Sequence, residues 1–210
     1  MSSHHVVREA QEPALLILTS NTLSLTQLGP LLEWSPTLVV NSAAFQALNT
    51  QGIKADVLVA GAEQQALLSQ EIEQQAPLQL INLAPEEAPL LPALRYLAEK
   101  QHRAVNIYAE AEEELQELLS LLNKQQLIKD VVVIYGQERY CLCRSGAYTK
   151  WYTAGETVRL HPESSCQFST KGLEPPLEQS ILTGTEKFRT KAATSIQIEA
   201  DGPFWLIEEL

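Results

Sequence analysis

The chain has 210 residues, with 26 acidic against 15 basic side chains, a formal net charge of −11 and a hydrophobic fraction of 45%. This length fits one large domain or two small ones, and the acidic balance excludes nucleic acid as the main partner, because duplex binding relies on Lys and Arg to neutralise phosphates. No stretch reaches the roughly 20 apolar residues of a membrane span, and the first residues lack the apolar core of a secretory signal.

Residues 1–13 are expected to form an N-terminal tail, after which short aliphatic runs alternate with amphipathic stretches. The aliphatic runs do not alternate strictly between apolar and polar residues, which is typical of parallel strands that are covered on both faces. They lie at residues 14–19, 38–40, 56–60, 78–83, 104–108 and 131–135. Helices are predicted between them, over residues 42–51, 63–75, 90–101 and 110–126. This order predicts a parallel, Rossmann-like open sheet over residues 14–136.

The pattern changes after about Gln137, where short alternating or aromatic-rich runs are separated by glycines. These runs lie at residues 138–144, 148–152, 157–160, 165–170, 195–199 and 204–207. No helical period of useful length occurs among them. They predict a small all-β sandwich over residues 137–210, so that the whole chain is an α/β protein of two domains.

Three cysteines, Cys141, Cys143 and Cys166, do not form an even disulfide set and offer too few ligands for a soft metal. They predict buried thiols in a reducing cytoplasm. The two histidines beyond the tail, His102 and His161, have no nucleophile beside them in the sequence and are predicted to be surface or capping residues.

Polar residues follow several of the predicted parallel strands. Asn41 and Ser42 come first, then Glu63 and Gln64, then Glu86, and finally the acidic run at 110–114. Ligands of open α/β sheets bind beyond the carboxyl ends of the strands, so several carboxylates could converge at one edge. The alternative is that these acids only begin helices, where the helix dipole favours negative charge. Glycine-rich phosphate loops, nucleophile elbows and zinc-protease motifs are absent from the sequence.

The order of these segments resembles the thiamine pyrophosphokinase family. Residues 39–64 are similar to the family's "ADGAA…L…GIKPDVIVGDFDS" region, and residues 168–177, FSTKGLEPPL, are similar to its "TxGLxWPL" signature. The resemblance implies a catalytic-type domain at residues 14–136 and a thiamine-binding-type domain at 137–210. It also implies the family's activity, transfer of a diphosphoryl group from ATP to thiamine with Mg²⁺, and a cytoplasmic homodimer formed through the β domain.

The chain departs from the family where the metal-binding aspartates should stand. Asn41 replaces the acid of the "DG" motif, Gly61 and Glu63 replace the two aspartates of "GDxDS", and Glu86 stands at the second acid of "DKDxTD". The resemblance assigns catalytic positions to Glu63, Glu86 and Glu113, with Glu63 and Glu86 as the metal ligands of any Mg²⁺ site. It assigns cofactor-binding positions to Asn41, Ser42 and Gln64.

The thiamine-binding positions are also altered. The resemblance assigns substrate binding to Thr170, Lys171, Gly172 and Thr190. Pro175 stands where the family has a stacking aromatic residue, and Arg189 lies near the family's "SN" pair, where an arginine would oppose a thiazolium cation.

Three hypotheses follow from these departures. The first is a thiamine pyrophosphokinase-like protein without catalysis that keeps a ligand pocket or a dimeric scaffold role. The second is an active ATP:thiamine diphosphotransferase whose metal site consists of glutamates. The third is a divergent enzyme that acts on another nucleotide or cofactor. Loss of several aspartates together favours the first, because removing one charge-stabilising group typically costs about 10²–10³ in rate.

Overall fold

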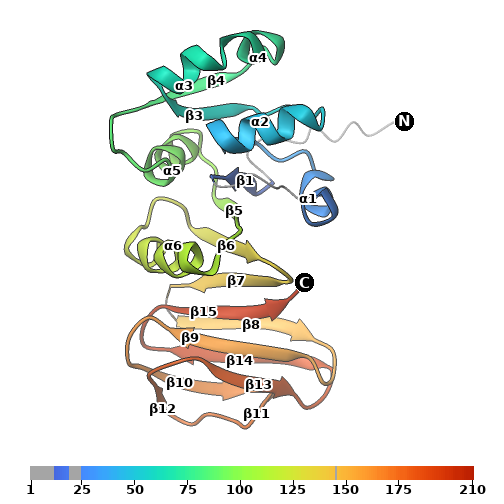
Figure 1. The fold of residues 1–210 in the computed structure, drawn as a ribbon. Helices are drawn as coiled ribbons and strands as arrows, with labels where there is room; N and C mark the ends of the chain where they lie inside the picture. Colours follow the sequence, from blue (N-terminus) through green and yellow to red (C-terminus); the bar gives the residue numbers. More distant parts are fainter. Residues whose placement is uncertain (1–11, 19–24, 145) are drawn as a thin grey trace, which may run out of the picture. The chain divides into compact units, whose positions relative to one another are not determined.

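The structure is a computed structural model, and it describes residues 12–18, 25–144 and 146–210 (Figure 1). The chain divides into two compact units. Unit 1 consists of Met1–Ala111 and Leu127–Val131, and unit 2 consists of Glu112–Gln126 and Val132–Leu210. This division places the helix at 112–124 with the later strands, whereas the predicted limits of 14–136 and 137–210 placed it with the earlier ones; those limits stay a prediction.

Unit 1 is built on parallel strands in the order β5-β1-β2-β3-β4. Their bounds are Ala14–Ile17 (β1), Leu38–Asn41 (β2), Val57–Gly61 (β3), Gln79–Leu83 (β4) and Ala104–Ala109 (β5). The aliphatic runs become buried strands, as predicted, except that β4 at the edge of the sheet is only partly buried. The α/β class predicted from the sequence is confirmed.

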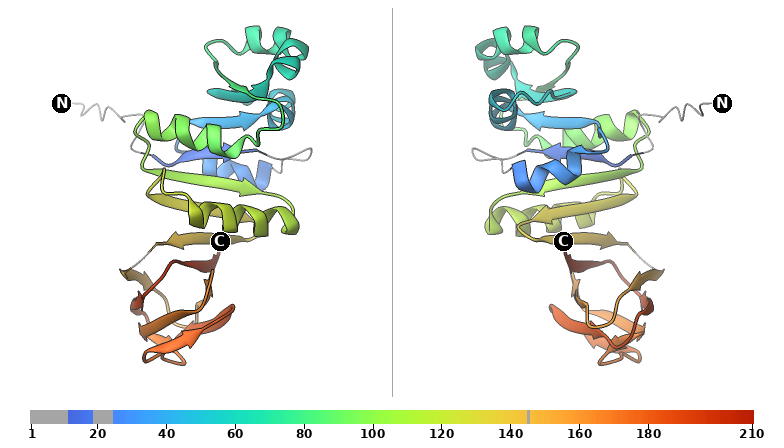
Figure 2. Two further views of the ribbon diagram at one scale, coloured as in Figure 1. Left: turned by 90° about the vertical axis from the view of Figure 1, so that its left-hand side faces the viewer. Right: turned by 90° about the vertical axis from the view of Figure 1, so that its right-hand side faces the viewer.

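Five helices of unit 1 lie within the described residues: α1 (Leu25–Leu32), α2 (Ser42–Thr50), α3 (Ala62–Leu67), α4 (Ser69–Gln74) and α5 (Leu90–Glu99). Figure 2 shows α5 on the opposite face of the sheet from α1 and α2. This follows from right-handed crossovers, because the chain moves from β1 to β4 in one direction and then returns across the sheet to β5. Among the described residues, no helix is long and apolar enough to cross a membrane.

Two helices of unit 1 differ from the sequence prediction. The predicted helix at 63–75 is divided at Leu68, which is 4% exposed, whereas Leu67 is 80% exposed. Burial of Leu68 therefore fixes this segment, and the two short helices change direction around it. The helix α1 was not predicted, because Gly29 and Pro30 inside it have low helix propensity.

Unit 2 contains α6 (Glu112–Lys124) and two sheets, in the orders β11-β13-β9-β15-β7-β6 and β12-β10-β14-β8. The strands of the first sheet are β6 (Asp130–Tyr135), which begins in unit 1, β7 (Glu138–Cys143), β9 (Thr157–Pro162), β11 (Leu173–Glu174), β13 (Glu186–Thr190) and β15 (Phe204–Glu209). The strands of the second sheet are β8 (Gly146–Tyr152), β10 (Cys166–Lys171), β12 (Ser180–Leu182) and β14 (Thr194–Ala200).

The two sheets of unit 2 share one apolar core. Alternate residues of each strand point inward, so that Phe168 of β10 meets Phe204 of β15 edge to face, with ring centroids 5.1 Å apart. Val158 and Leu160 of β9 and Ile196 and Ile198 of β14 are fully buried in the same core. The period-2 pattern seen in the sequence therefore decides which side chains hold the sheets together.

A buried carboxylate, Glu208 of β15, joins the two sheets beside this core and is only 4% exposed. It accepts hydrogen bonds from Arg139 Nε of β7 at 2.5 Å and from Lys150 Nζ of β8 at 2.7 Å. The hydroxyl of Tyr152 also donates to it. A buried charge is tolerated only when it is paired and hydrogen-bonded, and here three donors from two sheets meet that condition.

We expect Glu208→Gln to lower the free energy of unfolding by about 2 kcal/mol, because it leaves two half-buried cations without a counter-charge. Urea denaturation measures this change. The control is Glu209→Gln, since Glu209 is the exposed neighbour on the same strand. Equal stabilities of the two variants would show that the Glu208 cluster does not hold the sheets together.

Candidate functional site

The carboxyl ends of the unit 1 strands carry the predicted cofactor-binding residues. Asn41 ends β2 and caps α2: its Oδ1 accepts a hydrogen bond from the Ala44 backbone N–H at 2.9 Å. Its Nδ2 donates to the carbonyl oxygen of Leu18, beyond β1. Ser42 is the first residue of α2. Asn41 is therefore engaged on both sides by the main chain.

Amide side chains also occupy the end of β3. Oε1 of Gln64 accepts a hydrogen bond from the Gly61 backbone N–H at 2.8 Å. Nε2 of Gln65 donates to the Ala60 carbonyl at 2.8 Å and to Asn82 Oδ1 of β4, also at 2.8 Å. Of these amides, Asn41 stands where the family pattern has an acidic residue, Gln64 stands at the serine of "GDxDS", and Gln65 follows that motif.

The predicted catalytic glutamates do not form a described cluster. Glu63, in the first turn of α3, and Glu86, in the turn after β4, are both exposed. Glu113 lies in α6 of unit 2, and its side chain is outside what the structure describes. Among the described side chains, no group of three or more His, Cys, Asp or Glu is placed to hold a metal ion. Mg²⁺ is usually bound through only one or two carboxylates together with substrate phosphates and waters, so the assignment of Glu63 and Glu86 as its ligands stays a prediction.

The cysteine thiols of unit 2 are buried or partly buried and have raised pKa values. Burial raises the pKa of the Cys141 thiol to about 11 and that of Cys143 to about 12. Cys166 is buried, and its thiol donates to Asp201 Oδ1 at 3.0 Å. Thiols with raised pKa values remain protonated near neutral pH, and only thiolates bind metals or attack strongly. His102, predicted to be a surface or capping residue, is buried, and its backbone N–H donates to the Leu97 carbonyl at the end of α5 at 2.9 Å.

Three of the four predicted substrate-binding residues have structural roles. Oγ1 of Thr170 accepts from the Leu177 backbone N–H at 2.9 Å, and Thr190, which is buried, donates its hydroxyl to the Thr153 carbonyl at 2.5 Å. Gly172 has a φ of +83°, and a Cβ there would lie 3.2 Å from Cγ2 of Thr194. The turn therefore requires a glycine for packing and backbone reasons alone.

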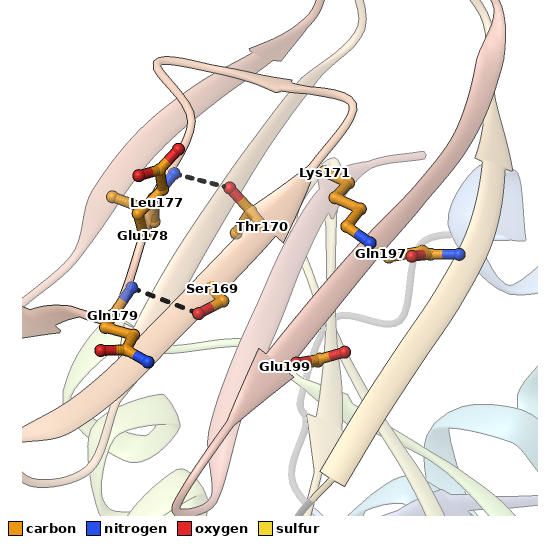
Figure 3. Close-up of a pocket in the computed structure, with 8 residues that line it drawn as sticks. All are labelled: Ser169, Thr170, Lys171, Leu177, Glu178, Gln179, Gln197 and Glu199. Carbon is orange, nitrogen blue, oxygen red and sulfur yellow. Dashed lines mark hydrogen bonds between the residues drawn. The ribbon is translucent and has the colours of Figure 1, made fainter.

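Lys171 is the predicted substrate residue that faces open space. It lines a groove of about 490 Å³ together with Leu177, Glu178, Gln179, Ser169, Thr170, Gln197 and Glu199. Figure 3 shows the segment 177–179 and the side chains of Gln197 and Glu199 on opposite sides of β10. Two hydrogen bonds hold that segment against the strand: Leu177 N–H to Thr170 Oγ1, and Gln179 N–H to Ser169 Oγ at 3.2 Å.

The chemistry of this groove favours a polar ligand with a positive charge. Two carboxylates, Glu178 and Glu199, oppose one ammonium, Lys171, and the amides of Gln179 and Gln197 supply donors and acceptors. Leu177 contributes apolar surface. Sequence reasoning missed Glu178, Gln197 and Glu199. The alternation along β14 could have placed Gln197 and Glu199 on its outer face, but only the pairing of β10 with β14 brings them beside Lys171.

Comparisons with known proteins identify the fold. No protein-family model matches the sequence, and a search of curated proteins returns no match. Thiamin pyrophosphokinase from Geobacillus thermodenitrificans is 16% identical, with a TM-score of 0.71 over 94% of this chain and 97% of that one. The Bacillus subtilis thiamine pyrophosphokinase is 16% identical, with a TM-score of 0.73 over 93% of this chain and 98% of that one. The Candida albicans thiamin pyrophosphokinase is 11% identical, with a TM-score of 0.67 over 96% and 90%.

These similarities extend over almost the full length of each protein, so both units take part in the match. They confirm, at the level of the fold, the resemblance drawn from residues 39–64 and 168–177. The chain has the fold of the thiamin pyrophosphokinases.

Proposed function

We propose that this chain is a thiamine pyrophosphokinase-like protein that does not catalyse diphosphoryl transfer and that binds a small cationic molecule in unit 2. On this proposal unit 1 corresponds to the Rossmann-like, nucleotide-binding-type domain and unit 2 to the thiamine-binding-type β-sandwich. The observation that carries the proposal is the set of amides at the strand ends. Asn41 hydrogen-bonds the main chain at the position of the "DG" acid, and Gln64 and Gln65 do so at the end of β3, beside Gly61, which stands at the first aspartate of "GDxDS".

The physical argument is one of charge. Transfer of a phosphoryl group is catalysed mainly by aligning the reactants and neutralising the charge that develops, which in these reactions is the task of Mg²⁺ and its carboxylate ligands. A neutral amide supplies an oxygen dipole without a full negative charge. An amide that already accepts a backbone N–H has also given up much of its capacity to bind a cation.

A second candidate function has one observation in its favour. Glu63 and Glu86 follow β3 and β4, which are neighbouring parallel strands with paired residues Gly61 and Leu83 at their ends. Both carboxylates therefore belong to the same edge of the sheet. An active diphosphotransferase would use Glu63, Glu86 and Glu113, with ATP and Mg²⁺ as cofactors.

We expect the purified protein to release no AMP from ATP above a protein-free control when Mg²⁺ and thiamine are present. Coupled AMP detection, with the Bacillus subtilis thiamine pyrophosphokinase run in parallel, provides the measurement. AMP release that Glu63→Gln and Glu86→Gln each abolish would overturn the proposal in favour of the glutamate-based enzyme. Release that persists in both variants would indicate a contaminating kinase.

The groove around Lys171 is proposed to bind thiamine, whose thiazolium carries a positive charge. We expect Glu199→Gln to weaken thiamine binding about tenfold and Lys171→Gln to strengthen it, because the first removes an attracting charge and the second a repelling one. Isothermal titration calorimetry measures both effects. Glu186→Gln, an exposed change away from the groove, serves as the control. Weakening by both groove variants, or an absence of binding by the unmodified protein, would contradict this assignment.

A second copy of the chain is the proposed partner, bound through the outer face of the β12-β10-β14-β8 sheet. Trp151 of β8 and Ile181 of β12 are 59% and 66% exposed. Trp151 pairs with Ser195 and Ile181 with Gln167, and both pairs point away from the core. Large exposed apolar side chains on one sheet face are typical of an interface, and the groove, formed on β10 and β14 between β12 and β8, would then lie within it.

We expect light scattering at micromolar concentration to give a dimer for the unmodified protein and a monomer for Trp151→Ser. Loss of a large aromatic anchor from a contact surface commonly costs 2 kcal/mol or more, which is about thirtyfold in the dissociation constant. Trp34→Ser is the matched control, because Trp34 is 71% exposed in unit 1. A monomeric unmodified protein would rule out this interface.

A further inference from the structure

A cluster of basic side chains lies on the outer face of the first sheet of unit 2. Lys187 and Arg189 are exposed on β13, with Phe188 between them pointing into the core. Strand pairing places Arg159 of β9 directly opposite Lys187. Only 15 of the 210 residues are Lys or Arg, so this is a local reversal of sign in an acidic protein.

Two ion pairs border this cluster. Arg159 pairs with Glu138, with 2.5 Å between Nη2 and Oε1, and Lys191 pairs with Glu174, with 2.9 Å between Nζ and Oε1. Glu174 is also the cross-strand neighbour of Arg189, but its carboxylate is engaged by Lys191. Among the described residues, no carboxylate lies within ion-pair distance of Lys187 or Arg189, although Glu209 shares a small hollow of about 80 Å³ with Lys187.

Lys187 and Arg189 have no ion-pair partner of their own among the described residues. Arg159, directly opposite Lys187, is itself paired with Glu138, which offsets the cross-strand repulsion between the two cations. Two positions along one strand place Lys187 and Arg189 roughly 7 Å apart at the backbone, on the same face. Their flexible side chains can therefore both reach one anion, which would supply the counter-charge that they lack.

A groove suited to such a ligand lies beside these residues. It has a volume of about 520 Å³ and is lined by Glu174, Pro175, Lys187, Phe188 and Arg189. This volume falls within the range of small-molecule sites and exceeds that of a bare phosphate ion. The guanidinium of Arg189 offers paired N–H donors in the geometry that phosphate oxygens prefer, and Lys187 adds a point charge.

We propose that this groove between β11 and β13 binds a small molecule through its phosphate or diphosphate group, with Lys187 and Arg189 as the ligating residues. The site is separate from the Lys171 groove, which belongs to the other sheet of unit 2 and has the opposite charge balance. This proposal is independent of the proposed thiamine binding and of the proposed loss of catalysis, because its test uses inorganic pyrophosphate, which is neither thiamine nor a phosphoryl donor to thiamine.

Inorganic pyrophosphate is the probe, titrated into the full-length protein in the presence of EDTA and followed by isothermal titration calorimetry. We expect saturable one-site binding that weakens about tenfold or more in Lys187→Gln/Arg189→Gln. The matched control is Lys54→Gln/Lys129→Gln, which makes the same change in net charge on exposed lysines of unit 1 and should bind as the unmodified protein does. Equal weakening in the control pair, or no saturable binding by the unmodified protein, would overturn the proposal.

A second measurement separates ligand binding from misfolding. Lys187→Gln alone should leave the melting temperature of the free protein close to that of the unmodified protein, because exposed Lys187 has no ion pair to lose among the described residues, while it lowers the stabilisation that pyrophosphate confers. A fall in the melting temperature of the free variant together with unchanged pyrophosphate stabilisation would show that Lys187 serves the fold and not a ligand.

Discussion

Backbone polar groups at the carboxyl ends of parallel strands must find hydrogen-bond partners, and the side chains that supply them decide what this edge of the sheet can bind. In unit 1 the partners are amides: Asn41 joins the end of β1 to α2, Gln64 holds the β3–α3 turn, and Gln65 links β3 to β4. Amides stabilise the same junctions that carboxylates could, but without a full negative charge. These hydrogen bonds hold the strand ends in place through amide dipoles alone.

Unit 2 shows how the acidic balance of the chain is distributed. Among its described side chains one carboxylate, that of Glu208, is buried; its charge is matched by Arg139 and Lys150, and it also bonds to Tyr152. Its two outer sheet faces differ in sign. The face of β10 and β14 exposes Glu199 and Lys171 beside Glu178, whereas the face of β13 exposes Lys187 and Arg189. The net charge of −11 is thus compatible with one surface that attracts cations and another that attracts anions.

The local structure of unit 1 was largely predictable. Aliphatic runs such as 56–60 and 104–108 are buried strands, and the helices at 42–51 and 90–101 occur close to their predicted limits. The errors came where tertiary burial outweighs local pattern. The segment 63–75 breaks because Leu68 and not Leu67 reaches the interior, and α1 forms despite Gly29 and Pro30. For the site, the sequence indicated Asn41, Gln64 and Lys171, but not the bonds that engage the first two.

By itself, the sequence determined the α/β class, the strand order along the chain, the resemblance in segment order to thiamine pyrophosphokinases and the absence of their aspartates. These follow from side-chain type and short-range period, which act within a few residues. Only the tertiary structure decided which outward residues meet. Glu199 lies beside Lys171 because β10 pairs with β14, and Lys187 faces Arg159 because β13 pairs with β9. The pairing joins Lys171 to Gln197, 26 positions further on, and Lys187 to Arg159, 28 positions back. Its register depends on how two sheets fill one core, which no local pattern encodes.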